Sequence, residues 1–130
     1  VLAKAIAQSV SSVDSNIRLM GLAGSLMLKE AEKAGLPVIS EVFADRAYND
    51  DGSLVNRKLP GAVIHDAQQA AARAVMMAKE HKVISINGKE IPLQADSICV
   101  HGDNAQAIEL VCTIRSALEA EGIAIKNFLA

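Results

Sequence analysis

The sequence has 130 residues, of which 51% are hydrophobic and 22% are charged, and its formal net charge is -2. These values are typical of one globular domain with its own core, and they exclude intrinsic disorder. There is no basic block, the aromatic share is only 2%, and no apolar run approaches the ~20 residues of a membrane span, so neither nucleic acid nor a membrane is expected as a partner.

Helical patterns and short apolar runs alternate along the first half of the chain. Ser25 is a suitable N-cap for a helix, which ends at Gly35. No helical period follows from residue 44 to residue 63, where Asp51-Gly52 is a turn signal and indicates a small hairpin. The expected elements are a helix over residues 1–13, a strand over 17–22, a helix over 25–34 and a strand over 38–43.

The second half of the chain continues this alternation. Asp66 and Gln69 have the spacing of a capping box, and Asn87-Gly88 between two apolar runs predicts a type I′ hairpin. After the last helix, the run Ile123–Ile125 is a candidate final strand. The expected elements are a helix over 66–80, hairpin strands over 83–86 and 89–93, a strand over 97–100, and a helix over 104–121 whose inward face carries Ala107, Val111, Ile114 and Leu118.

Strands that alternate with helices predict an α/β fold with a mainly parallel sheet and a small hairpin insertion. Three strand-and-helix or strand-and-loop units are too few to close a (β/α) barrel. The chain also opens without Met, inside an apolar periodic segment. Residues 1–130 are therefore expected to be a single-domain fragment that forms part of a larger barrel.

The first polar cluster includes the last part of the expected strand over 38–43 and the residues after it, at the end where ligands bind in parallel α/β folds. It runs from Glu41 through Asp45 and Arg46 to Tyr48 and combines carboxylates, a guanidinium and a phenol. Such a set can bind a small anionic molecule, because Arg holds a carboxylate through a bidentate pair. The alternative is a turn with surface ion pairs at Asp45 and Arg46 and a hairpin position for Tyr48.

The second polar cluster is the run from Cys99 to Asn104, in which a buried strand leads into His101-Gly102-Asp103 and then a helix. His101 can move a proton near neutral pH, and a helix N-terminus is a ready anion site. The alternative is that Asp103 or Asn104 only caps the helix and that His101 only packs. One His beside one Asp is no metal signature, because zinc or iron needs at least three ligands.

The long connection from Asn49 to Val63 could cover a site, as long loops after strands often do. Its Arg57 could add an anion contact or could be a solvated loop charge. Cys99 and Cys112 are too few for a disulfide framework, so we expect packing residues with reduced thiols in a cytoplasmic protein. The sequence contains no P-loop and no GxGxxG run that would indicate nucleotide binding.

Several of these runs, in this order and spacing, make the chain resemble the LamB/YcsF family from about Ile17 to Gly122. The most specific are E-V-F-A-D-R-x-Y and C-V-H-G-D. The matching runs are Gly21–Ser25, Gly35–Pro37, Ser40–Tyr48, Asp51–Val55, Arg57, Pro60–Ala62 and Cys99–Asp103. Members of this family are considerably longer, so the resemblance implies that this chain is the C-terminal half of such a protein.

The resemblance implies a distorted (β/α) barrel related to polysaccharide-deacetylase-like folds. It also implies the role of the A subunit in a three-subunit 5-oxoprolinase, which opens the lactam of 5-oxoproline to glutamate with hydrolysis of ATP. The implied partners are two further subunits that resemble allophanate-hydrolase components. ATP is the implied co-substrate, bound together with those partners, and a requirement for metal is left open.

For this substrate, a small ring with one carboxylate, the two polar clusters take complementary roles. Because parallel strands end on the same side of a sheet, we expect both clusters to face one cleft. The acid–base candidates are His101, Asp103, Asp45 and Glu41, and the candidates for binding substrate are Arg46, Tyr48 and Arg57. Two other functions stay open: a metal-dependent amide hydrolase acting alone, and a non-catalytic protein of the same complex that binds substrate.

Overall fold

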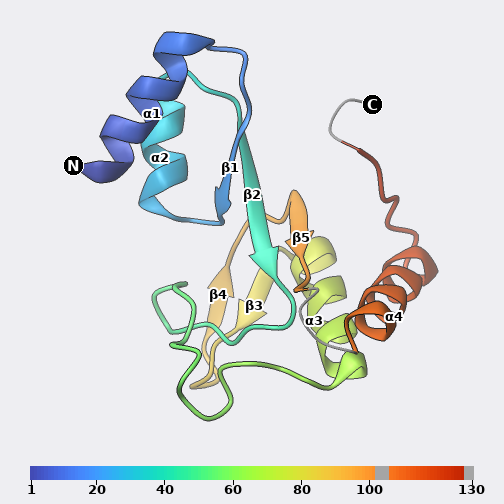
Figure 1. Ribbon diagram of the computed structural model, residues 1–130. Coiled ribbons are helices and arrows are strands. Elements are labelled where there is room, and N and C mark those ends of the chain that lie inside the picture. Colours follow the sequence, from blue (N-terminus) through green and yellow to red (C-terminus); the bar gives the residue numbers. More distant parts are fainter. Residues whose placement is uncertain (102–105, 128–130) are drawn as a thin grey trace.

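The computed structural model describes residues 1–101 and 106–127, which form four helices and five strands (Figure 1). The helices are α1 (Leu2–Val13), α2 (Leu26–Lys33), α3 (Ala67–Glu80) and α4 (Ala107–Ala120). The strands are β1 (Leu19–Leu22), β2 (Val38–Phe43), β3 (Lys82–Ile84), β4 (Glu90–Pro92) and β5 (Ser97–Cys99). No helix in these described residues is long and apolar enough to cross a membrane.

The main sheet has three strands in the order β1-β2-β5, and both pairs are parallel. The strands β3 and β4 form a separate antiparallel hairpin. The predicted α/β class with a mainly parallel sheet is therefore confirmed. An open sheet of three parallel strands flanked by helices is consistent with part of a (β/α) barrel.

Local hydrogen bonds fix where the helices begin and end. Oγ of Ser25 accepts from the backbone N–H of Leu28 at 3.4 Å, and Oδ1 of Asp66 accepts from that of Gln69 at 2.7 Å. Both predicted N-caps are confirmed, because each satisfies a backbone donor that has no partner inside its helix. Gly35, with φ at 78°, ends α2 in the left-handed conformation that glycine adopts without strain.

The largest buried cluster joins α3 to α4 and to the end of β2. The side chains that α3 contributes are small and those that α4 contributes are branched. The cluster consists of Ala44, Ala70, Ala71, Ala74, Leu110, Ile114 and Leu118. The alanines of α3 let the two helix axes approach closely, so that the larger side chains of α4 fill the space between them. A second pair, α1 and α2, lies beside β1 (Figure 1) and packs through Ala7, Ala31 and Leu36.

Three predictions about the second half of the chain were wrong. On α4 the inward positions predicted for Ala107, Ile114 and Leu118 are confirmed, but Val111 is 47% exposed and Leu110, at 8%, is buried in its place. Residues 123–125 form no strand, because the N–H of Ile123 donates to the carbonyl of Leu118 in the hydrogen-bond pattern that ends α4. In the β3–β4 turn only Gly88 has positive φ, whereas a type I′ turn needs positive φ at Asn87 too.

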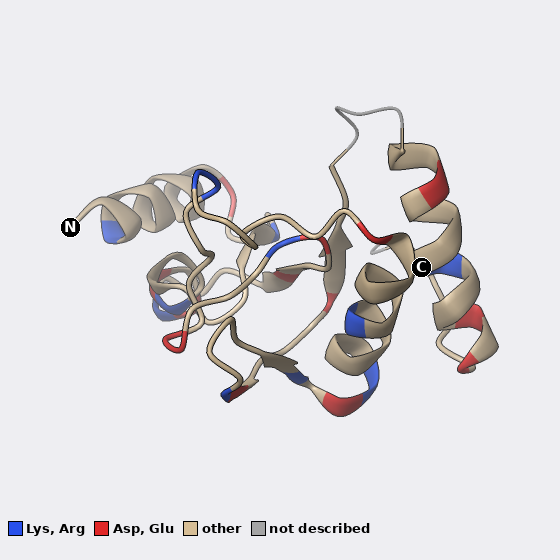
Figure 2. Ribbon diagram, turned by 90° about the horizontal axis from the view of Figure 1, so that it is seen from below, with Lys and Arg blue, Asp and Glu red and all other residues tan. Residues whose placement is uncertain are grey.

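The start of α4 also differs from the expected helix over 104–121. The helix begins at Ala107 with Gln106 at the N-cap position, and no side chain caps it. Asp103 and Asn104, the expected caps, lie outside the described residues. Charged residues are interspersed over the fold, and neither sign gathers on one element (Figure 2).

Candidate functional site

The strand register brings Asp45 and His101 together. In the β2–β5 pair, Phe43 lies opposite Cys99, and the two polar residues each follow their strand two positions later. Parallel strands that are in register at their last residues carry the next residues to the same edge of the sheet. There Nδ1 of His101 lies 2.7 Å from Oδ2 of Asp45, a short hydrogen bond between residues of both predicted clusters.

A third residue, Arg57, reaches the other nitrogen of the same ring. Its Nη2 lies 2.7 Å from Nε2 of His101. A guanidinium can only donate and an ionised carboxylate can only accept. The two partners therefore determine which nitrogen of the imidazole carries the proton. The Nδ1–H donates to Asp45, and the lone pair of Nε2 accepts from Arg57. His101 is therefore held as a neutral imidazole in the Nδ1–H tautomer.

The chain of hydrogen bonds runs from the interior to the surface. The side chain of Asp45 is 7% exposed and that of His101 is 25% exposed, while Arg57 is exposed. Phe43 stacks on the imidazole with ring centroids 5.8 Å apart. His101 and Arg57 are therefore accessible from solvent, whereas Asp45 lies behind the ring that it contacts.

One oxygen of Asp45 stands out within this arrangement. Oδ1 is buried and has no hydrogen-bond partner within residues 1–101 and 106–127. A buried polar atom of this kind is costly to the fold, and a catalytic role is one of the reasons for which a fold retains one. The carboxylate is thus held for its contact with His101 rather than for a saturated internal network.

Arg46 and Tyr48 occupy the interior of the segment after β2 instead of facing a cleft. Arg46 is 6% exposed, and its guanidinium donates to the carbonyl of Val55 at 2.7 Å and to that of Ala62 at 3.3 Å. The hydroxyl of Tyr48 accepts from the N–H of Phe43 at 2.9 Å, and burial raises the pKa of this phenol. The geometry does not support the substrate contacts expected of these two residues. It supports a role in holding the loop that carries Arg57.

Glu41 and Cys99 lie just behind the site on the two paired strands. Glu41 is two residues before Phe43 in β2, so its side chain leaves the same face of the strand, and it is half-buried. Burial raises the pKa of the Cys99 thiol, with smaller contributions from the charges of Glu41 and Asp45. A thiol in this state is a poor nucleophile, which agrees with a packing residue.

Arg73 of α3 is a positioning residue that the sequence analysis did not single out. Its guanidinium donates to the carbonyl of Ala44 at 3.2 Å and to that of Arg46 at 2.8 Å. These contacts fix the backbone on both sides of Asp45. In the sequence, Arg73 is a single arginine among the alanines of a helix face that packs closely. A cation at such a position needs buried hydrogen-bond acceptors, and this pattern could have identified Arg73.

Comparisons with known proteins identify the family to which this chain belongs. A model of the LamB/YcsF family matches residues 1–130. The chain belongs to this family. The 5-oxoprolinase A subunit from Campylobacter jejuni subsp. doylei is 56% identical, with 98% of this chain and 51% of the relative covered. The protein of the same name from Fusobacterium nucleatum is 52% identical, over 97% of this chain and 49% of the relative.

A solved structure is also similar to this LamB/YcsF chain. The crystal structure of "Lactam Utilization Protein" from Thermus thermophilus matches with a TM-score of 0.87 and 40% identity, over 97% of this chain and 50% of that one. The chain thus spans about half the length of the curated relatives it matches.

The described part of this LamB/YcsF chain does not make a metal centre. No group of three or more His, Cys, Asp or Glu side chains within residues 1–101 and 106–127 is placed to hold an ion. Both nitrogens of His101 face protein partners, and one of these is a cation. Asp103, an acid–base candidate of the sequence analysis, lies outside the described residues, and Asp45 fills the position that orients His101.

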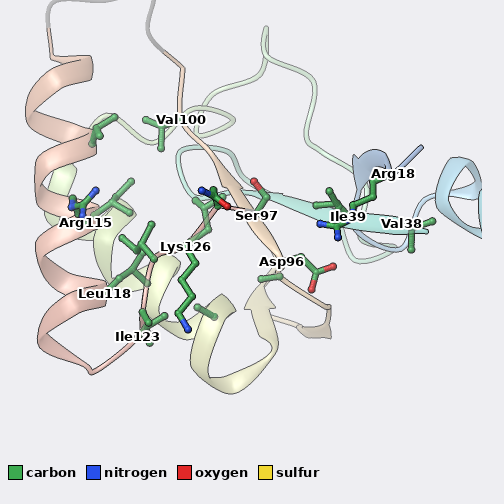
Figure 3. Close-up of a pocket in the computed structure, with 18 of the residues that line it drawn as sticks. Arg18, Val38, Ile39, Asp96, Ser97, Val100, Arg115, Leu118, Ile123 and Lys126 are labelled. Atoms are coloured by element: carbon green, nitrogen blue, oxygen red, sulfur yellow. The ribbon is translucent and has the colours of Figure 1, made fainter. Parts of the chain in front are cut away.

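A groove of about 820 Å³ lies elsewhere in this LamB/YcsF fold, between the sheet, α4 and residues 123–127 (Figure 3). Its walls are mostly apolar, and its charged lining residues are Arg18, Asp96, Arg115 and Lys126. It contains none of Asp45, His101 and Arg57. The groove therefore offers a packing surface, and the hydrogen-bonded residues Asp45, His101 and Arg57 lie at the sheet edge outside it.

Proposed function

We propose that this chain is part of the A subunit of a 5-oxoprolinase and that His101 is the acid–base residue of its site. The observation that carries the proposal is the hydrogen-bonded series from Asp45 through His101 to Arg57 at the carboxyl ends of two parallel strands. Relatives at 56% and 52% identity that bear this name support the choice of substrate, 5-oxoproline. ATP as co-substrate, bound together with two partner subunits resembling allophanate-hydrolase components, belongs to the same proposal.

A stable five-membered lactam needs activation before water can open it. Transfer of the γ-phosphoryl group of ATP to the amide oxygen, with release of ADP, makes the carbon a better electrophile. Water then adds to this carbon and gives a proton to Nε2 of His101, the ring C–N bond breaks, and the nitrogen takes a proton from His101. The product is an acyl phosphate of glutamate, which a second water splits into glutamate and phosphate.

The other residues of the proposed site divide between the ring and the substrate. Asp45 holds the imidazole and stabilises its charged form while the proton is on Nε2. Arg57 binds the carboxylate of the substrate through a bidentate pair. Glu41, on the same face of β2 as Phe43, stays a second acid–base candidate. Asp103, which lies outside the described residues, stays an acid–base candidate of the proposal through its position in the sequence, two residues after His101.

Substitution of His101 tests this proposal directly. In the full-length protein assembled with its partner subunits, His101→Ala should lower ATP-dependent glutamate formation from 5-oxoproline by about 10²-fold or more, the scale of losing one acid–base group. His65→Ala is the matched control, because His65 is exposed before α3 and outside the site. Near-normal turnover by His101→Ala would remove His101 from the reaction.

The same variant separates this proposal from a non-catalytic role in binding substrate. If His101 transfers protons, His101→Ala should still bind 5-oxoproline in calorimetry while turnover is lost. If the protein only carries substrate, the two quantities should fall together. Turnover that needs ATP with Mg²⁺ and survives removal of transition metals argues against a metal-dependent amide hydrolase acting alone.

A further inference from the structure

In this structure, Arg57 occupies the nitrogen of His101 that the proposed reaction needs as a base. Its guanidinium occupies the lone pair of Nε2, 2.7 Å away, while Nδ1–H is committed to Asp45. No other lone pair remains on the imidazole, so His101 cannot accept a proton from water in this state. Protonation of Nε2 would also set two N–H donors and two positive charges against each other.

Arg57 is the partner that can leave. It is exposed in the loop over 49–63, whereas Asp45 is buried. The backbone of the loop is fixed on both sides of Arg57, because Arg46 donates to the carbonyl of Val55 before it and to that of Ala62 after it. The side chain of Arg57 can therefore swing away from His101 without displacement of the backbone that carries it.

We propose that the carboxylate of the ligand draws Arg57 off His101 and so frees the base only when the correct substrate is bound. A guanidinium pairs with a carboxylate through two charge-assisted hydrogen bonds, which are stronger than one bond to a neutral imidazole nitrogen. The proposal rests on the proposed function for the identity of the substrate and the role of His101. It makes Arg57 a specificity-determining residue that acts on the base as well as on the ligand.

This coupling predicts how the site tells lactams apart. 5-Oxoproline and 2-pyrrolidinone share the ring and the amide, and only 5-oxoproline carries a carboxylate. If Arg57 only added binding energy, 2-pyrrolidinone would bind weakly to a site whose base is free. If a carboxylate is needed to release Arg57, 2-pyrrolidinone leaves the guanidinium on Nε2. His101 then stays blocked as a base even when 2-pyrrolidinone saturates the site.

Nitrogen NMR of the imidazole tests the release on the full-length protein. With ¹⁵N-labelled histidine, saturating 5-oxoproline should shift the Nε2 resonance of His101 toward that of a free lone pair, and 2-pyrrolidinone should leave it unchanged. Arg57→Ala should give the shifted resonance without any ligand. Lys58→Ala is the matched control, an adjacent exposed cation in the same loop, and should behave like the unmodified protein.

The outcomes separate this inference from the proposed function. An Nε2 resonance that does not move when 5-oxoproline saturates the site, or that is the same in Arg57→Ala and the unmodified protein, overturns the release by Arg57. His101 can remain the acid–base residue in that case. Near-normal turnover by His101→Ala refutes the proposed function, whatever the resonance does.

Discussion

Asp45 and His101 are 56 residues apart in the sequence and meet through one hydrogen bond of 2.7 Å. Asp45 is buried, so its effect on a reaction passes through the imidazole that it orients. Loss of the carboxylate would let the ring rotate about its side-chain bonds and present Nε2 in the wrong direction. In the proposed reaction, the charge on Asp45 would also stabilise the imidazolium that forms while His101 holds the proton.

The first prediction concerns this orientation. Asp45→Ala should lower kcat of the assembled enzyme by about 10²-fold or more and change KM much less, because the lost interaction acts mainly in the transition state. Asp45→Asn should retain more activity, since its amide oxygen can still accept from Nδ1–H. Steady-state kinetics on 5-oxoproline measure both. Equal activity of the two variants, or a rise in KM alone, would contradict the orienting role.

Arg46 shows why the chemistry of a residue type does not identify a site by itself. A guanidinium at the end of a strand suits a carboxylate ligand, and the sequence analysis assigned it that role. In the fold it is buried and ties Val55 to Ala62. Nothing in the local sequence distinguishes an arginine that binds a ligand from one that binds backbone carbonyls. The distinction depends on how the loop over 49–63 returns.

At the scale of the loop, Arg46→Ala should therefore cost stability. The buried carbonyl of Val55 would lose its donor, whereas that of Ala62 still accepts from the N–H of Ala47 at 3.0 Å. One unsatisfied buried carbonyl gives a loss of about 1–3 kcal/mol in the free energy of unfolding. Urea denaturation of the full-length protein measures this loss. Lys33→Ala is the control, because Lys33 is exposed on α2 away from the groove and its ion pair with Glu30 contributes little to stability. A substitution of Arg46 that raises KM with unchanged stability would restore the original assignment.

Elements that depend on local chemistry were predictable from the sequence. Ser25 and Asp66 cap their helices because a short polar side chain next to a free N–H needs no distant partner. Gly35 ends α2 for an equally local reason, its positive φ. The juxtaposition of Asp45 and His101 was also accessible, because buried strands followed by polar residues have few arrangements in a parallel sheet.

Features set by packing between distant elements were less accessible. The apolar face of α4 contains both Leu110 and Val111, and only contact with α3 selects Leu110. The turn at Asn87-Gly88 has the residues of a type I′ hairpin, but the strand pairing of Ile84 with Glu90 leaves a longer loop between them. Contact between Arg57 and His101 depends on the path of the whole loop and had no signal in the spacing.

At the scale of the whole molecule, the described fold leaves much of its sheet and groove uncovered. In the three-stranded sheet, β1 and β5 each pair with β2 alone within the described residues. The groove beside α4 is lined by apolar side chains of β2, β5 and the segment after α4. The chain spans about half the length of its relatives. We propose that the remaining length of the full protein covers these surfaces.

This proposal predicts the behaviour of residues 1–130 expressed alone. Open strand edges and an uncovered apolar groove favour pairing with other copies, so the isolated chain should self-associate or precipitate, while the full-length protein stays dispersed. Light scattering during size-exclusion chromatography measures the difference. Val111→Glu places a charge in the groove and should reduce self-association of the isolated chain. Ile108→Glu, on α4 but outside the groove, is the matched control and should reduce it less. A monodisperse monomer of residues 1–130 that melts cooperatively would show that these surfaces need no cover.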